Sequence, residues 1–184
     1  MAKYELRGVS PLLKMFLPGE FVKSIFEINP YKLKERNIKG IITDLDNTLV
    51  EWDRPSATPK LIEWFKEMND SGIKVTIVSN NVEKRVKDFS DPLRIPFIYK
   101  ARKPMGRAFR KAINDMQLKK EEVVVIGDQL LTDVLGGNRN GFHTILVVPV
   151  ASTDGAMTKF NRKIERRIMD TLKKKGMIQW EEKK

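Results

Sequence analysis

Residues 39–48 read KGIITDLDNT, an apolar run that ends in two aspartates one residue apart. A short run that is apolar throughout, without polar alternation, is typical of a strand buried on both faces of a parallel sheet. Four more such runs follow along the chain, and amphipathic stretches separate them. The five strands predicted in this way lie at residues 40–44, 74–79, 96–99, 123–126 and 144–148.

The stretches between these strands have the periodicity of helices. Apolar residues recur at three- and four-residue steps after Pro59 and again after Pro104. Strands that alternate with helices predict right-handed βαβ units. The predicted fold class is therefore α/β, a Rossmann-like fold in which helices cover both faces of a central parallel sheet.

Polar side chains follow four of the predicted strands, and ligands bind at that edge in open parallel sheets. Each of these strands thus contributes polar chemistry to a single edge. In chain order the residues are Asp44, Asp46 and Thr48 after the first strand, Ser79 and Asn80 after the second, Lys103 after the third, and Asp128 after the fourth.

The carboxylates at this edge predict a metal site. Asp44 and Asp46 can converge on one small volume, Asp128 brings a third carboxylate, and like charges so close together repel unless a cation neutralises them. Because the chain has no cysteine, we expect the ligands to be mainly oxygen atoms, and Mg²⁺ fits such a site best. One aspartate can then attack phosphorus while a neighbouring carboxylic acid protonates the leaving oxygen. Ser79 could hydrogen-bond the phosphoryl oxygens, and Lys103 could neutralise their charge.

The residues after the four strands resemble the four motifs of the haloacid dehalogenase (HAD) superfamily phosphatases, in the same order and each after a strand. The agreement spans residues 40–149, about three-fifths of the chain. The resemblance implies that Asp44 is the nucleophile and a Mg²⁺ ligand, and that Asp46 is the acid/base and places its backbone carbonyl on the metal. It implies that Asp128 is a further ligand and Asp133 a supporting acidic residue near the metal. The substrate-binding set would be Thr48, Ser79, Asn80 and Lys103.

Two segments are similar to one branch of that superfamily. Residues 39–44 and the segment GDQLLTDVLGGNRNG at 127–141 look like the YqeG family, a capless, type IIIA branch. This branch is similar to the mitochondrial phosphatidylglycerophosphatases, and that kinship implies a phosphorylated lipid head group as substrate.

The spacing of the motifs leaves no room for a cap domain. Only 30 residues lie between Thr48 and Ser79, and one helix accounts for them; Lys103 follows Asn80 by 23 residues. A site without a lid cannot enclose a small metabolite, so we expect a phosphorylated substrate that is large or presented by a surface.

Charge divides the chain into three parts. Residues 1–39 carry eight Lys/Arg and four Asp/Glu, residues 40–157 carry seventeen and sixteen, and residues 158–184 carry ten and four. We expect an N-terminal amphipathic extension at 1–39, a HAD phosphatase core at 40–149, and a basic C-terminal helical extension at 150–184. The apolar residues of the last segment recur at three- or four-residue steps: Met157, Phe160, Ile164, Ile168 and Leu172.

The two flanking segments have two interpretations. Basic amphipathic helices can lie on anionic lipid, so peripheral contact with an anionic membrane is one expectation. The other is that both apolar stripes pack on the core and the charges are simply solvated. No apolar run of 18 residues is present, so we expect a cytoplasmic protein, with peripheral contact at the inner membrane face as one option.

The predicted function is a magnesium-dependent phosphomonoester hydrolase that acts through a phosphoaspartate, with phosphatidylglycerophosphate or another phosphorylated lipid head group as candidate substrate. A polynucleotide or phosphoprotein phosphatase is an alternative, but the lack of a recognisable nucleic-acid module makes nucleic acid the less favoured partner. A non-catalytic interaction protein with a phosphoacceptor aspartate is a third reading. Asp46 argues against it, because receiver domains lack that second carboxylate.

Overall fold

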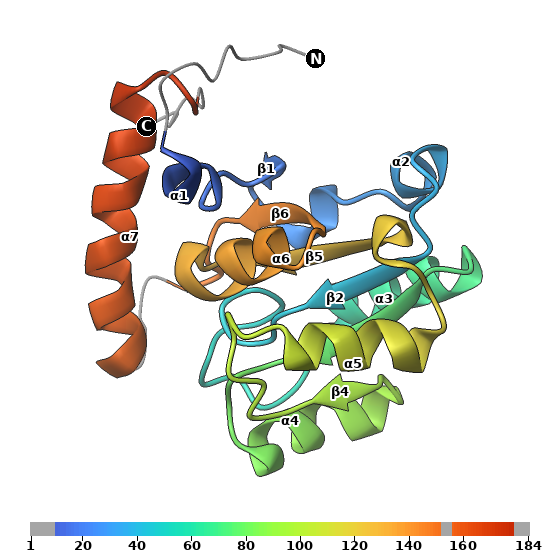
Figure 1. The fold of residues 1–184 in the computed structure, drawn as a ribbon. Coiled ribbons are helices and arrows are strands. Elements are labelled where there is room, and N and C mark those ends of the chain that lie inside the picture. Colours follow the sequence, from blue (N-terminus) through green and yellow to red (C-terminus); the bar gives the residue numbers. More distant parts are fainter. Residues whose placement is uncertain (1–9, 152–155, 179–184) are drawn as a thin grey trace.

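The computed structural model describes residues 10–151 and 156–178 (Figure 1). Side chains in the second range are described from Phe160 onward, so the predicted contribution of Met157 lies outside the described residues. The elements are α1 (Pro11–Lys14), β1 (Glu20–Val22), η1 (Ile25–Glu27), α2 (Pro30–Glu35), β2 (Gly40–Thr43), α3 (Pro59–Asp70), β3 (Lys74–Val78), α4 (Glu83–Ser90), η2 (Asp91–Leu93), β4 (Phe97–Ile98), α5 (Arg107–Met116), η3 (Lys120–Glu122), β5 (Val123–Gly127), η4 (Leu130–Val134), α6 (Leu135–Arg139), β6 (His143–Val147) and α7 (Ala156–Lys174).

A single sheet of six parallel strands forms the centre of the molecule, in the order β1-β6-β5-β2-β3-β4. The five predicted strands are confirmed as β2 to β6. Strand β1 was not predicted, because a strand of three half-buried residues is too short to give a pattern. It pairs with β6 and extends the sheet by one strand.

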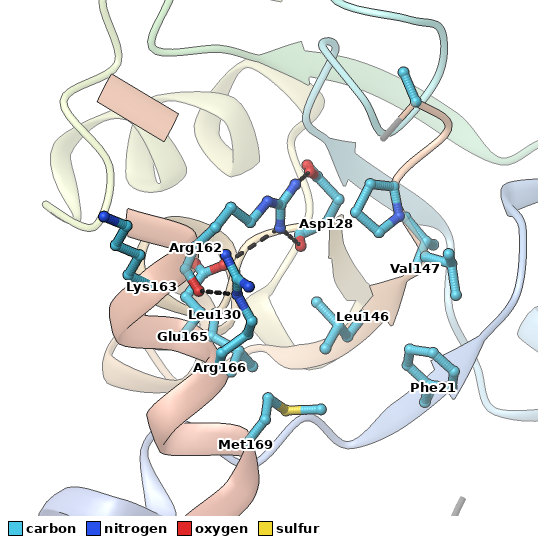
Figure 2. A pocket seen from close by; sticks show the side chains of 13 residues that line it. Phe21, Asp128, Leu130, Leu146, Val147, Arg162, Lys163, Glu165, Arg166 and Met169 are labelled. Carbon is cyan, nitrogen blue, oxygen red and sulfur yellow. Dashed lines mark hydrogen bonds and ion pairs between the residues drawn. The ribbon is translucent and has the colours of Figure 1, made fainter. Parts of the chain in front are cut away.

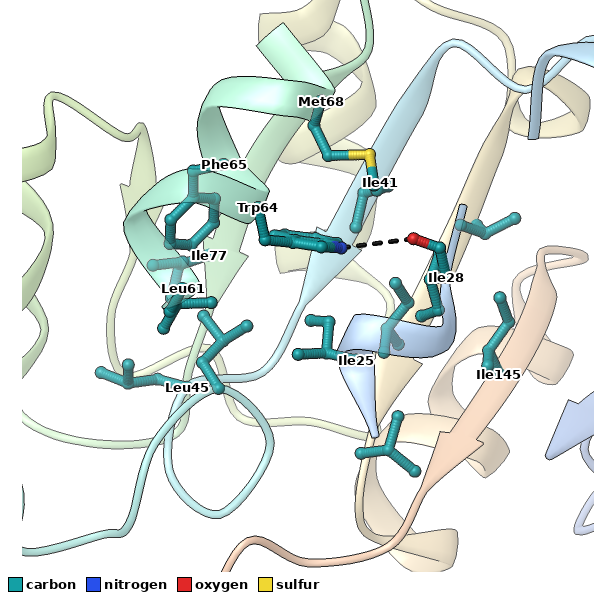
Figure 3. Close-up of a cluster of buried hydrophobic side chains, with 14 of the residues drawn as sticks. Ile25, Ile28, Ile41, Leu45, Leu61, Trp64, Phe65, Met68, Ile77 and Ile145 are labelled. Carbon is teal, nitrogen blue, oxygen red and sulfur yellow. Dashed lines mark hydrogen bonds between the residues drawn. The ribbon is translucent and has the colours of Figure 1, made fainter. Parts of the chain in front are cut away.

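Helices cover both faces of the sheet, as predicted. Ile41 and Ile42 are neighbours on β2, yet they belong to different cores because successive strand residues point to opposite faces. One core includes side chains of α3 and α4, and the other includes those of α5. In the first core, Trp64 Nε1 of α3 donates a 3.3 Å hydrogen bond to the carbonyl of Ile28 (Figure 3).

The segment before β2 packs on the main body of the protein. Its buried apolar residues belong to the same core as β2 and α3; they are Ile25, Ile28, Leu33 and Ile38. This part of the predicted N-terminal extension therefore shares the sheet and the core of residues 40–149. The domain boundary at residue 39 stays a prediction.

Helix α7 lies along the side of the molecule, beside β6 and α6 (Figure 1). Ile168 and Met169 pack against Leu130, Val134 and Leu146, whereas Phe160 remains 62% exposed. The apolar stripe of α7 is thus divided between a packed half and an exposed half. None of the helices described is long and apolar enough to cross a membrane.

The connections between the strands agree with the predicted lack of a cap. Among the described residues, α3 is the only helix between β2 and β3, and α4 with the short turn η2 joins β3 to β4. Neither connection contains a further folded unit, so within the described residues no covering domain is inserted between these strands.

Candidate active site

Three carboxylates converge at the carboxyl edge of the sheet. Asp44 directly follows β2, and its backbone N–H continues the sheet by donating a 3.0 Å hydrogen bond to the carbonyl of Ile126. One carboxylate oxygen each of Asp44, Asp128 and Asp133 lies within 4.8 Å of the others, and all three residues are buried. We call these three residues the carboxylate cluster.

Asp133 extends from the π-helical turn η4 into the cluster, and the lack of a side chain at Gly127 makes room for it. A Cβ atom on Gly127 would lie 2.2 Å from Asp133 Cγ, closer than van der Waals contact allows. Glycine at the end of β5 therefore leaves the space that the Asp133 carboxylate fills. The backbone N–H of Gln129 donates a 3.2 Å hydrogen bond to Asp133 Oδ2 and orients it.

Lys103 neutralises part of the cluster. Its Nζ lies 2.9 Å from Asp44 Oδ1 and 2.7 Å from Asp133 Oδ1. Burial by itself lowers the pKa of Lys103, but the charges of Asp133 and Asp44 and the hydrogen bonds to them outweigh burial and raise it. Asn80 holds the Lys103 backbone, since its Oδ1 accepts a 2.7 Å hydrogen bond from the Lys103 N–H. Lys103 therefore stays protonated, with its charge directed at Asp44.

Asp46 points toward a second set of partners. Its carboxylate accepts hydrogen bonds from Asn81 Nδ2 at 2.9 Å and from Arg85 Nε at 3.0 Å. Burial is the main cause that raises the pKa of Asp46, and the negative charge of Asp44 adds to it against the effects of Asn81 and Arg85. A raised pKa suits a general acid at neutral pH. The predicted contribution of Asp46 to the metal site, through its backbone carbonyl, stays a prediction.

The two hydroxyl groups predicted for the substrate lie at the same edge. Thr48 Oγ1 donates a 2.8 Å hydrogen bond to Asp128 Oδ1, and Ser79 Oγ accepts a 3.1 Å hydrogen bond from the backbone N–H of Asn81. Both residues are buried. All eight predicted residues are thus gathered at one edge, while their individual roles stay predictions.

Arg162 of α7 also reaches this site, and the sequence did not indicate it. Its Nη1 donates a 2.7 Å hydrogen bond to the backbone carbonyl of Asp128, and its Nη2 pairs with Asp128 Oδ2 (Figure 2). Nη1 also contacts Glu165 Oε2 at 3.3 Å, and Glu165 Oε1 accepts a 2.9 Å hydrogen bond from the N–H of Leu131. Along the sequence Arg162 is one of several basic residues on an amphipathic stripe, so no local signal separates it from solvated charges.

Opposing effects act on Asp128. Burial raises the pKa of Asp128, the charge of Arg162 lowers it, and the charges of Asp44 and Asp133 raise it again. The net shift of the pKa is upward, because burial outweighs the charge of Arg162 and the two neighbouring carboxylates add to the effect of burial. A divalent cation would relieve this repulsion, and a set of three carboxylates without nitrogen or sulfur ligands matches the preference of Mg²⁺. The chemistry of the cluster therefore fits the predicted metal.

Comparison with known proteins decides the family. The chain is 77% identical over 171 residues to "Probable phosphatase YqeG" of Bacillus subtilis (strain 168), a match that covers 93% of this chain and 99% of that protein. The chain belongs to the YqeG family of HAD phosphatases. A HAD-hydrolase-like family profile also matches residues 100–174. The predicted family and the predicted phosphatase class are both confirmed.

Other relatives are less similar to this chain. Phosphatidylglycerophosphate phosphatase 1 of Arabidopsis thaliana is 26% identical over 174 residues, which are 88% of this chain and 49% of that protein. Among solved structures, the cobalt-bound deoxy-D-mannose-octulosonate 8-phosphate phosphatase of Haemophilus influenzae has a TM-score of 0.52 at 18% identity. That match covers 74% of this chain and 90% of that one, and it supports the fold alone.

Proposed function

We propose that this HAD phosphatase is a magnesium-dependent phosphomonoester hydrolase that forms a phosphoaspartate on Asp44. The convergence of the carboxylate cluster within 4.8 Å carries the proposal. Asp44, Asp128 and Asp133 would hold Mg²⁺, which would offset the negative charge that brings a phosphate and three carboxylates together.

The side chains suggest a division of labour in two steps. In the first, a carboxylate oxygen of Asp44 attacks phosphorus while protonated Asp46 donates its proton to the departing alkoxide. In the second, the Asp46 carboxylate takes a proton from a water that attacks the phosphoaspartate, and inorganic phosphate leaves. Lys103 neutralises charge beside Asp44, while Ser79, Asn80 and Thr48 would bind the phosphoryl group or hold its surroundings.

The proposed substrate is a phosphorylated lipid head group such as phosphatidylglycerophosphate. The name of the Arabidopsis relative, matched over 88% of this chain, supports this class. The lack of a cap among the described elements also favours a substrate that a surface presents. An uncovered edge can approach a head group that remains in its bilayer.

Together with the lipid substrate, we propose peripheral contact with an anionic membrane. Phe160 and Ile164 on α7 are 62% and 36% exposed, and Lys163, Arg166 and Arg167 of the same helix are exposed beside them. Exposed apolar and cationic side chains on one helix suit an anionic lipid surface. Sedimentation with vesicles of phosphatidylglycerol and of phosphatidylcholine checks it; the protein should pellet with the first only, and equal recovery with both would remove the proposal.

Phosphate release tests the proposed chemistry. Wild type should hydrolyse p-nitrophenyl phosphate with Mg²⁺ and not with EDTA, and Asp44→Asn should lower the rate at least about 10³-fold. Asp70→Asn, at the exposed end of α3, is the matched control and should keep full activity. Equal rates in wild type and Asp44→Asn would refute the phosphoaspartate.

A substrate panel tests the proposed class. Phosphatidylglycerophosphate in mixed micelles should be hydrolysed with a higher kcat/KM than a 5′-phosphorylated oligonucleotide or a phosphoserine peptide. A preference for either polymer would replace the lipid with a polynucleotide or a phosphoprotein substrate.

A further inference from the structure

A pocket of about 670 Å³ opens directly beside the carboxylate cluster. It lies between α7 on one side and the ends of β1 and β6 on the other (Figure 2). Asp128 and Arg162 line one part of it, so the pocket and the proposed catalytic site share a wall. No role proposed so far for the site uses this space.

The wall away from Asp128 is apolar. Leu130 and Leu146 are 2% and 5% exposed and belong to a packed core cluster, so they form a firm floor. Phe21 and Met169 are half-buried, so part of each side chain is still accessible from the pocket. Figure 2 shows Leu146 below Asp128 in this view, with Met169 and Phe21 farther down.

The part of the wall that α7 contributes carries positive charge. Lys163 and Arg166 are exposed and line the pocket next to Arg162. An apolar hollow with cationic residues at its rim, beside carboxylates that would hold a divalent cation, complements an anionic head group attached to a hydrocarbon chain. A sugar phosphate has no hydrocarbon chain to bury against Leu130, Leu146 and Met169.

We propose that this pocket binds the hydrocarbon portion of an amphiphilic phosphomonoester whose phosphate lies at the carboxylate cluster. The proposal rests on the proposed function and adds to it a second subsite, which recognises the substrate by its tail. Each methylene that enters the pocket should tighten binding about fourfold, corresponding to about 0.8 kcal/mol per buried CH₂.

Binding of alkylphosphonates tests the tail subsite without any turnover. Ethyl-, butyl-, hexyl- and octylphosphonate are titrated calorimetrically into the full chain with Mg²⁺, below the concentrations at which they form micelles. In wild type the affinity should rise up to about fourfold per added methylene until the pocket is full. An affinity that changes less than twofold from ethyl- to octylphosphonate would overturn the proposal.

Variants of one pocket residue test whether the dependence of affinity on tail length arises in this pocket. Met169→Gln keeps the side-chain length but makes this part of the wall polar, so the gain from longer tails should shrink while ethylphosphonate binds as before. Met169→Leu should restore the gain. Ile62→Gln makes the same kind of change at a 48% exposed position of α3 that does not line this pocket, and it should behave as wild type. Equal tail dependence in Met169→Gln and wild type would refute the pocket as the tail subsite.

The two proposals fail differently. If phosphate release proves independent of Asp44 while tail dependence follows Met169, the pocket stands and the proposed chemistry falls. If Asp44-dependent hydrolysis is present with flat tail dependence, the hydrolase stands and the pocket proposal falls.

Discussion

Lys103 Nζ lies 2.7 Å from Asp133 Oδ1, and both side chains are only 2% exposed. Lys103 comes from the loop after β4, whereas Asp133 comes from η4 after β5. A buried pair of this kind contributes little net stability while both partners are present, but the loss of one partner leaves the other charged and buried. Loss of Lys103 should destabilise the protein more than loss of one partner of an isolated pair, because Asp44 pairs with the same lysine.

Replacement of this lysine should therefore lower the free energy of unfolding by more than the replacement of an exposed lysine does. Lys103→Met should lower the free energy of unfolding in EDTA by about 3–5 kcal/mol, because it leaves the carboxylates of Asp133 and Asp44 without their cation. Urea denaturation measures this. Lys111→Met removes the exposed partner of Asp115 on α5 and should cost less than about 1 kcal/mol. If the two variants lost similar amounts of unfolding free energy, the larger effect expected for the buried ion pair would be refuted.

Magnesium should stabilise the fold through the carboxylate cluster. At a concentration of about 100 times its Kd, a ligand specific to the folded state adds about 2.7 kcal/mol. For a chain of this length that amounts to a rise in Tm of about 5–10 °C. Differential scanning calorimetry should show the rise in wild type and in Asp70→Asn but not in Asp128→Asn. A rise retained by Asp128→Asn would place the cation elsewhere.

The ion pair of Asp46 with Arg85 should set the alkaline limit of activity. Arg85 lowers the pKa of Asp46, so its removal should raise that pKa further. A general acid with a higher pKa stays protonated to higher pH, so Arg85→Gln should move the alkaline limb of the kcat profile upward. The pH dependence of phosphate release checks this. Lys84→Gln, an exposed neighbour on α4, is the control and should leave the limb in place.

Arg162 should act on Asp128 in two opposite ways. Arg162→Gln removes charge-assisted hydrogen bonds from Asp128, so in EDTA the free energy of unfolding should fall by about 1.5–3 kcal/mol. The same variant removes a positive charge beside a proposed Mg²⁺ ligand, so half-saturation should need less Mg²⁺. Denaturation in EDTA and calorimetric Mg²⁺ titration measure the two effects, with exposed Arg167→Gln as control. An unchanged or weaker Mg²⁺ affinity would show that Arg162 does not compete with the cation.

The fold class and the five central strands could be predicted from the sequence, and so could the convergence of eight polar residues at one edge of the sheet, whose individual roles stay predictions. These features are local, since apolar runs mark buried strands and the polar residues come directly after them. Parallel pairing then brings Asp44, Ser79 and Asp128 to one edge whatever the details of packing. For the same reason the four motifs alone indicate the family.

The contacts between side chains depend on the tertiary structure. Strand β1 gave no pattern, because its three residues become a strand only through pairing with β6. The interaction of Arg162 with Asp128 joins residues 34 apart in sequence through the docking of α7. The pocket beside them combines β1, β6 and α7. Such contacts depend on how separate elements pack, and the order of residues along a single element carries no record of that packing.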